Sequence, residues 1–196
     1  MELMLRIFLL QNLYDLADMK VMTEVIDGRA FANFCGIGSP DGDMIRRFRN
    51  ILEKNGIQEK IFAAVVEILE EHKLILKKGT IVDSTLIEVL NSTENCENKR
   101  DPKARSTKKR NNWQFGYKAQ IGVNKKTGLV HYLKTTAANE HDVTAAAELL
   151  LGKEKTVYGD SEYFGIEKHS EAILKNKKGK KIKYKITQRP SMIQKL

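Results

Sequence analysis

Two aspartates occupy positions where a carboxylate is uncommon. Asp83 lies in the segment 80–89, where β-branched and apolar residues alternate, and Asp160 ends the short apolar segment 156–160. Aspartate is disfavoured inside β-strands, so both positions suggest a chemical role. If the two segments form neighbouring strands, the carboxylates converge and suit Mg²⁺, which typically takes one or two carboxylates together with water and substrate phosphate. Paired ions of this kind stabilise the attacking and leaving oxygens of a phosphoryl displacement.

Each aspartate also has a purely structural interpretation. Asp83 could accept backbone hydrogen bonds near the end of its strand, and Asp160 could cap a turn or the helix after it. The pattern alone leaves these alternatives open and favours them. Glu88 is a weaker candidate ligand, because an odd spacing from Asp83 places the two side chains on opposite faces of a strand.

Other residues with chemical potential rank lower. His141 and Asp142 stand at a predicted helix start, where capping is a more typical role than catalysis. Trp113 lies beside basic residues and is a candidate for stacking on a nucleic-acid base. Phe115 and Tyr117 alternate with it, and we expect them on the core face of a strand. The sequence contains none of the common phosphate-loop, dinucleotide, nucleophile-elbow or zinc-protease motifs.

The charge of +9 is concentrated in two segments. Residues 172–196 contain nine Lys or Arg and no acid, and residues 99–126 contain ten against a single acid. Clustered positive charge indicates a polyanionic partner, because each neutralised phosphate releases counterions. A solvated basic loop and tail is the alternative. The candidate DNA-binding residues are Lys99, Arg100, Lys103, Arg105, Lys108, Lys109, Arg110 and Trp113.

Residues 1–78 predict a small all-helical N-terminal domain. Apolar periodicity indicates helices over 5–17, 21–33 and 57–74, and a further helix that begins at Ser39 and Pro40 and stops at Asn55. Short helices joined by glycine-containing turns are compatible with a helix-turn-helix DNA-binding motif. A simple packed bundle is the commoner outcome for such a pattern.

The periodicity changes from about 3.6 to 2 near Gly79. The elements that we predict after this point are a strand over 80–89, a surface loop over 91–112, a strand over 114–123, a hairpin turn over 124–128, a strand over 129–135, a helix over 143–151 capped by Asn139 or Asp142, a strand over 156–160, a helix over 162–175 and a strand over 183–187. This order predicts an α/β fold with a mixed sheet, in which three antiparallel strands are followed by parallel additions.

The remaining composition excludes several classes of protein. The two cysteines, Cys35 and Cys96, are too few and too far apart for a disulfide framework or a structural zinc site. The longest apolar run near the start, residues 7–10, is too short to span a bilayer. These features predict a cytoplasmic protein.

Five segments closely resemble DDE-type transposases of bacterial insertion sequences, and among them the insertion-sequence-five family. They are GTIVDSTLIE at 79–88, DP at 101–102, WQFGYK at 113–118, TTAANEHD at 135–142 and VYGD at 157–160. The resemblance implies an RNase H-like catalytic core over 79–196, with Asp83 and Asp160 as the first two catalytic acids. It also implies that these acids bind Mg²⁺ or Mn²⁺ and that transposon-end repeats and target DNA are the partners. A second copy of the chain is a further candidate partner, and the expected location is the bacterial cytoplasm at the nucleoid.

Two departures from the family pattern bear on activity. The family's third acid is a Glu in a Val-Glu-His-Pro-Phe-like motif, which is absent here, and no acid follows Glu171. Glu162 replaces the glycine of the family's Asp-x-Gly-Tyr motif and is a possible accessory ligand, as is His141. We therefore expect a truncated fragment, incomplete at its C-terminus and inactive in strand transfer. A non-catalytic basic DNA-binding module and an RNase H-like nuclease completed by Glu88 or Glu162 are the alternatives.

Overall fold

The computed structural model describes residues 2–36, 41–76, 79–89, 100–109, 111–169, 175 and 177–188. The chain divides into two compact units, residues 1–67 and residues 68–196, and the division falls within helix α5 (Ile57–Glu71). The two units are described separately below.

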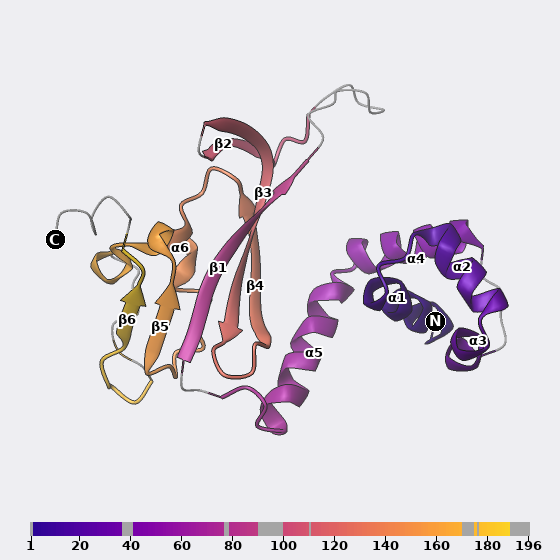
Figure 1. Ribbon diagram of the computed structural model, residues 1–196, viewed down its shortest axis with the longest axis horizontal. Coiled ribbons are helices and arrows are strands. Elements are labelled where there is room, and N and C mark those ends of the chain that lie inside the picture. Colours follow the sequence, from indigo (N-terminus) through magenta and orange to yellow (C-terminus); the bar gives the residue numbers. More distant parts are fainter. Residues whose placement is uncertain are drawn as a thin grey trace. The chain divides into compact units, whose positions relative to one another are not determined.

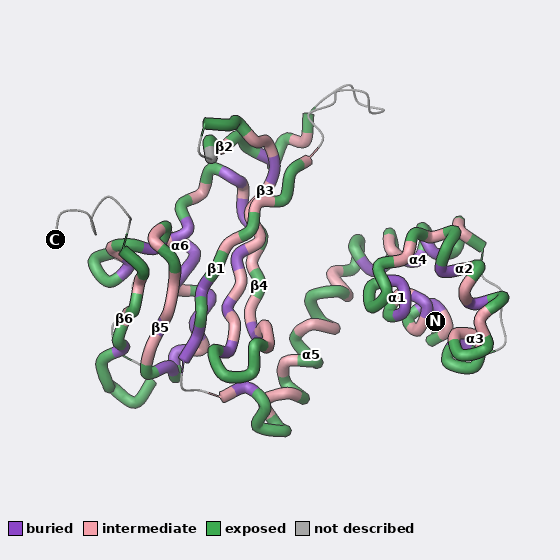
Figure 2. The backbone as a smooth tube through the Cα atoms, viewed as in Figure 1, coloured by how far each residue is buried: buried purple, intermediate pink, exposed green. Residues whose placement is uncertain are grey.

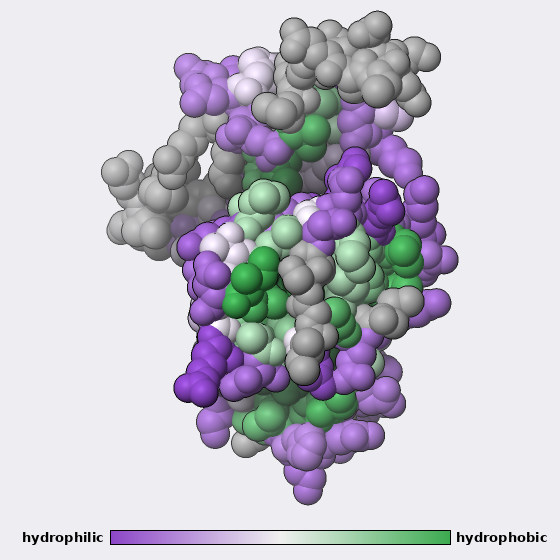
Figure 3. Space-filling model, turned by 90° about the vertical axis from the view of Figure 1, so that its right-hand side faces the viewer, coloured by the Kyte–Doolittle hydropathy of each residue, from purple (hydrophilic) through white to green (hydrophobic). Residues whose placement is uncertain are grey.

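The first unit is helical and consists of α1 (Glu2–Leu13), α2 (Asp18–Asp27), α3 (Arg29–Cys35), α4 (Gly42–Lys54) and most of α5 (Figure 1). Its core is formed by one apolar stripe from each of the first four helices: Met4, Ile7, Leu10, Val21, Val25, Cys35, Ile45, Phe48 and Leu52. Other apolar side chains of this unit remain exposed, among them Leu13 and Met19. Figure 3 shows hydrophobic patches among the polar residues on one face of the molecule. The prediction of a helical N-terminal region agrees with these elements.

The single helix predicted over 21–33 is wrong, because Gly28 divides it into α2 and α3. Gly28 has extended backbone angles, φ −90° and ψ 108°, and glycine has a low helix propensity. A Cβ atom at this position would lie 2.4 Å from the carbonyl oxygen of Glu24, so the break has room only for glycine.

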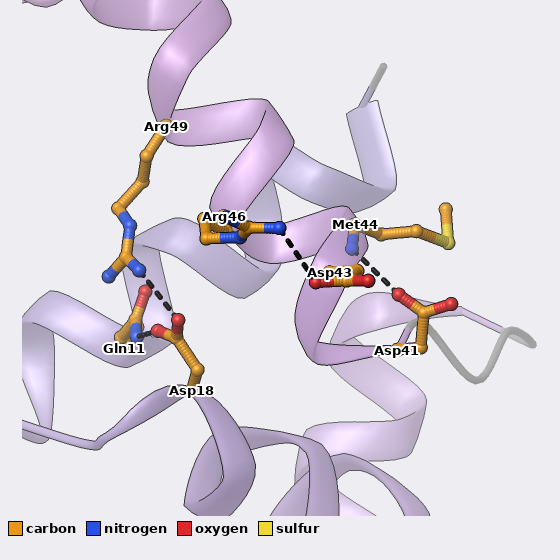
Figure 4. A network of polar contacts seen from close by, with 7 residues as sticks. All are labelled: Gln11, Asp18, Asp41, Asp43, Met44, Arg46 and Arg49. Carbon is orange, nitrogen blue, oxygen red and sulfur yellow. Dashed lines mark hydrogen bonds and ion pairs between the residues drawn. The ribbon is translucent and has the colours of Figure 1, made fainter. Parts of the chain in front are cut away.

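Polar contacts connect three of these helices (Figure 4). The Asp18 carboxylate accepts a hydrogen bond of 2.6 Å from Nε2 of Gln11 and forms an ion pair of 2.6 Å with Nη2 of Arg49. Asp41 caps α4 by accepting a hydrogen bond from the Met44 amide at 2.7 Å. The predicted helix start at Ser39 and Pro40 lies outside the described residues.

Helix α5 has the apolar stripe that the sequence predicts, but none of its residues is buried (Figure 2). The side chains of Val65 and Ile68 are 47% and 53% exposed. Within the described part of the chain, no helix has the length and apolar character needed to cross a lipid bilayer.

The second unit contains a six-stranded mixed sheet (Figure 1). Its strands are β1 (Gly79–Glu88), β2 (Arg105–Lys109), β3 (Asn112–Asn124), β4 (Val130–Ala137), β5 (Thr156–Gly159) and β6 (Lys183–Ile186). The order is β2-β3-β1-β5-β6, and β4 pairs with the second half of β3. Strands β1, β3 and β4 form the antiparallel portion, while β5 and β6 are added in parallel. The predicted mixed α/β fold is confirmed.

The two faces of this sheet differ in burial. The covered face carries Thr80, Val82 and Val157 and packs on α6 (Asp142–Ala146) and the segments that follow it. The open face carries the alternate residues of β1, which include Asp83 and Ile87, and the Ile87 side chain is 48% exposed.

Phe115 and Tyr117 lie on the open face and are half-buried, so the prediction that they face the core is wrong. The buried positions of β3 are instead Gly116, Gln120, Gly122 and Asn124. The reason is close packing, because a Cβ atom on Gly122 would lie 2.4 Å from the carbonyl oxygen of Leu149. The chain after α6 therefore approaches the face that holds small residues, and the apolar residues of β3 point the other way.

Three further predictions need correction. Strand β2 lies within the segment expected to be a loop, because an edge strand needs no apolar alternation and its pairing is supplied by β3. Helix α6 ends at Ala146, and its N-cap is His141, which forms no side-chain capping bond. The long helix expected after Glu162 is replaced by two short 3₁₀ helices, η1 (Ser161–Tyr163) and η2 (Ile166–Lys168), because Gly165 adopts φ +88° between them. The 124–128 turn and the final strand are confirmed.

Candidate active site

Asp83 and Asp160 are positioned by the parallel pair β1 and β5. The register runs from Gly79 opposite Thr156 to Ile81 opposite Tyr158. The pairing ends there, two residues before Asp83 on β1 and two residues before Asp160, which directly follows β5. Neighbouring strands are about 4.8 Å apart, and residues in parallel register project from the same face. Asp83 projects from the open face of β1, Asp160 directly follows the neighbouring strand β5, and both residues are exposed.

One oxygen of each carboxylate has a structural role. Oδ1 of Asp83 accepts a hydrogen bond from the Ser84 amide at 2.8 Å, and Oδ1 of Asp160 accepts one from the Glu162 amide at 2.9 Å, which caps η1. The structural interpretation of each aspartate is thus correct for one oxygen. No other hydrogen bond or ion pair joins either carboxylate to the described residues, so Oδ2 of each remains available to a ligand.

The pair fits a divalent cation in charge and chemistry. Both residues are exposed, and no Lys or Arg of the described segments neutralises them through an ion pair. Two carboxylates with room for water and a phosphate oxygen match the ligand preference of Mg²⁺. Across the described ranges, no cluster of three or more His, Cys, Asp or Glu side chains is arranged to hold a metal. A metal held by Asp83 and Asp160 would therefore find no third such side chain already arranged for it among the described residues.

Tyr163 packs behind the acid pair as part of the covered-face core. Burial raises the pKa of its phenol well above the ordinary value, and the negative charges of Asp142, Asp83 and Asp160 raise it further. The phenol therefore stays neutral at physiological pH.

Comparison with known families decides the identity of the chain. The family described as Transposase DDE domain matches residues 75–195, and the family described as Transposase domain (DUF772) matches residues 1–51. The first match covers more than half of the sequence.

The chain belongs to the DDE transposase family.

The mixed sheet is consistent with the RNase H-like fold of DDE transposases. Transposase domains of this family generally use divalent metal ions, and DNA is the partner that the family suggests. No solved structure matches the chain.

Two accessory candidates of the transposase, His141 and Glu162, line a pocket of about 230 Å³ together with Ser84 and Lys118. Ser84 and Asp83 are successive residues of β1, so their side chains point to opposite faces of the sheet. The pocket is therefore entered from the side that carries Ser84, whereas the acid pair is on the open face.

The predicted capping role of Asp142 is wrong. Its carboxylate is almost fully buried and forms an ion pair of 3.0 Å with Nζ of Lys118, which also donates a hydrogen bond to the carbonyl of Glu140. This buried ion pair holds the start of α6 against β3. The sequence offers little indication of this ion pair, because Lys118 is one of many basic residues in its segment.

The basic candidates of the transposase have different environments. Arg100 and Lys103 are exposed, and the Arg105 guanidinium donates to the carbonyls of Pro102 and Ala104. Lys108 on β2 lies opposite Trp113 on β3, whose side chain is 72% exposed. Lys99, Arg110 and the side chain of Lys109 lie outside the described residues.

Sequence reasoning missed one contact that organises this region. The Tyr117 hydroxyl donates a 2.6 Å hydrogen bond to Oδ2 of Asp101, which holds the pKa of Asp101 below its ordinary value. The single acid of the basic segment is thus used to attach that segment to β3.

Proposed function

We propose that this DDE transposase acts on DNA by metal-dependent phosphodiester cleavage and strand transfer at the ends of an insertion sequence, with Asp83 and Asp160 as catalytic metal ligands. The observation that supports the proposal is the parallel pairing of β1 with β5, whose register, continued by two residues, would set Asp83 opposite Asp160. The five matching segments favour the insertion-sequence-five family. Mg²⁺ is the proposed ion, and Mn²⁺ is the usual alternative for the same oxygen ligands.

Each part of the site has a distinct task in this proposal. The amides of Ser84 and Glu162 hold Oδ1 of Asp83 and Asp160, and Oδ2 of each would bind the metal. A bound divalent ion supplies charge stabilisation to the phosphate oxygens and lowers the pKa of a bound water or hydroxyl. The neutral Tyr163 phenol behind the pair adds no competing charge.

We further propose that the 196-residue polypeptide by itself does not transfer strands. Its sequence has no acid after Glu171 and no counterpart of the family's third-acid motif. Loss of one preorganised charge-stabilising group commonly lowers the rate by about 10² to 10³. Glu162 is the nearest carboxylate in sequence to Asp160, and we regard it as an accessory ligand at most.

DNA binding in this proposal uses the exposed basic segment. Lys103, Arg105 and Lys108 would contact phosphates, and the exposed ring of Trp113 would stack on a base. The helix-turn-helix hypothesis for the first unit stays a prediction.

Metal binding tests the acid pair directly. Mn²⁺ titration followed by electron paramagnetic resonance should show one class of site in the unmodified chain. Asp83→Asn and Asp160→Asn should each weaken it at least tenfold, because a carboxylate ligand is lost. The control is Asp43→Asn, an exposed acid that pairs with Arg46 in the first unit. Equal Mn²⁺ affinity in all four proteins would refute the proposed site.

A non-catalytic DNA-binding module is the second candidate, and it is favoured by the absence of a three-ligand cluster among the described residues. In that case the chain binds DNA with a steep salt dependence, while the Asp83→Asn and Asp160→Asn variants bind Mn²⁺ like the unmodified protein. Metal-dependent cleavage of an RNA–DNA hybrid would instead favour the nuclease alternative.

A further inference from the structure

Three residues from separate segments form a cationic–aromatic cluster around Tyr158, two residues before Asp160. The Lys125 ammonium lies 3.7 Å from the centroid of the Tyr158 ring, and the Lys185 ammonium lies 5.8 Å from it. Lys125 is in the turn after β3, Tyr158 is in β5 and Lys185 is in β6. Cation–π contacts of this kind are worth about 0.5–1 kcal/mol at exposed sites, enough to restrict where each ammonium lies.

The cluster lies on the same face of the sheet as the two acids. Tyr158 is in parallel register with Ile81 of β1 and with Lys185 of β6. The side chains of Ile81, Tyr158 and Lys185 therefore project from the same, open face of the sheet. Tyr158 precedes Asp160 by two residues, which corresponds to about 7 Å along a strand. This is about the axial length of two nucleotides of a DNA strand.

The local backbone makes room for this arrangement. A Cβ atom on Gly79 would lie 3.3 Å from Cε2 of Tyr158 and 3.6 Å from Cβ of Lys125, so glycine allows the ring and the lysine to pack together. Asn124 fixes the turn, since its Oδ1 accepts hydrogen bonds from the amides of Lys126 and Thr127. Lys125 is therefore held by a hydrogen-bonded turn, whereas Lys185 is held by strand β6.

A cavity of about 420 Å³ adjoins the cluster and has no acidic wall. It is lined by Leu76, Gly79, Asn124, Lys125, Lys126 and Tyr158. Neither Lys125 nor Lys185 forms an ion pair with a described residue. The Lys125 ammonium, with a smaller contribution from Lys185, holds the pKa of Tyr158 below its ordinary value, which is the expected effect of concentrated positive charge.

We propose that Lys125 and Lys185, positioned by Tyr158, bind a backbone phosphate of the DNA strand that crosses Asp83 and Asp160. The inference rests on the proposed function and adds residues that hold the substrate beside the reacting phosphate. DNA binding at this face requires nearby positive charge, because two unpaired carboxylates repel an approaching polyanion. Cations on the same face offset that repulsion and guide the strand across the acids.

The test is DNA binding without metal. A fluorescent duplex of about 40 base pairs is titrated in EDTA at several salt concentrations, with the unmodified chain and with the double variant Lys125→Gln/Lys185→Gln. Each neutralised phosphate contributes about 0.9 to the slope of log affinity against log salt, so the double variant, which loses one phosphate contact, should lose about one unit of slope. Its affinity at low salt should fall about tenfold or more.

Lys134→Gln is the matched control. It removes the same charge from a lysine of β4 that lies on the covered face and is paired with Glu148 at 2.6 Å. We expect less than a twofold change in affinity and an unchanged slope. An equal loss in Lys134→Gln and in each single variant, Lys125→Gln and Lys185→Gln, would show a general charge effect and overturn the proposal.

Tyr158 is a positioning residue, and two variants separate this role from folding. Tyr158→Phe keeps the ring and should bind DNA like the unmodified chain, whereas Tyr158→Leu should lose part of the salt slope at an unchanged melting temperature. If the unmodified chain shows no salt-dependent binding, the proposed function itself fails. If it binds but the double variant keeps the full slope, only the present inference fails.

Discussion

Charged side chains have different environments on the two faces of the sheet. On the covered face, Asp142 pairs with Lys118, and Glu154 accepts hydrogen bonds from Thr80 and from the amides of Leu151 and Lys153. On the open face, Asp83 and Asp160 each keep an oxygen that no described residue contacts. Charges that the protein satisfies internally support the fold, whereas charges left unsatisfied on one face are available to a ligand.

The largest effect should come from breaking the covered-face ion pair. Lys118→Met leaves the Asp142 carboxylate buried without its counter-ion, and loss of one partner of a buried pair costs about 3–5 kcal/mol. We expect a decrease of about 3 kcal/mol in the free energy of unfolding in urea. The double variant Lys118→Met/Asp142→Leu should recover most of this loss. If Lys118→Met were as stable as the unmodified chain, the covered-face ion pair would not support the fold, and the proposed difference between the two faces would be wrong.

Close packing gives the next effect. Gly122→Ala on the covered face introduces a Cβ atom that would lie 2.4 Å from the Leu149 carbonyl oxygen, and such overpacking costs about 1–3 kcal/mol. Thermal unfolding should show a lower melting temperature. Ala119→Gly on the open face is the control for altered strand propensity, and it should destabilise the protein by less than Gly122→Ala.

The buried His131 should make stability depend on pH. Burial lowers its pKa in the folded state below the ordinary value of 6.5, so the unfolded chain binds a proton first as the pH falls. The free energy of unfolding should therefore decrease below about pH 6.5, by at most about 1.4 kcal/mol per pH unit, until the folded-state pKa is reached. Urea unfolding from pH 7.5 to 5 measures this slope. His131→Gln should reduce it, whereas the exposed His72→Gln should leave it unchanged.

The smallest effect is expected for the open-face acids. Asp83→Asn and Asp160→Asn in EDTA should leave the free energy of unfolding unchanged or raise it by up to about 1 kcal/mol, because mutual repulsion is removed and no ion pair is lost. Differential scanning calorimetry of the two variants and the unmodified chain measures this change in stability. A large destabilisation by either variant would assign these acids a structural role like that of Asp142.

Much of the sheet was predictable from local pattern. Alternation over 80–89 located β1, the Asn124–Gly128 turn located the hairpin, and the short apolar segment before Asp160 located β5. These signals are local, because strand alternation and turn chemistry depend on neighbouring residues in the chain. Strand β2 was missed since its polar residues acquire strand geometry only by pairing with β3.

The residue types and their order determined that one acid would lie within a strand and another directly after a strand. They also determined the two basic segments and the mixture of helices with a sheet. Tertiary structure alone decided which face each strand presents to the protein interior. That choice depends on where α6 and the chain after it find small residues such as Gly122, a long-range packing condition that no local pattern expresses. Tertiary structure also brings Lys125 and Lys185 to the Tyr158 ring, since the meeting of Lys185 with Tyr158 requires the β5–β6 pairing and not only their spacing in sequence.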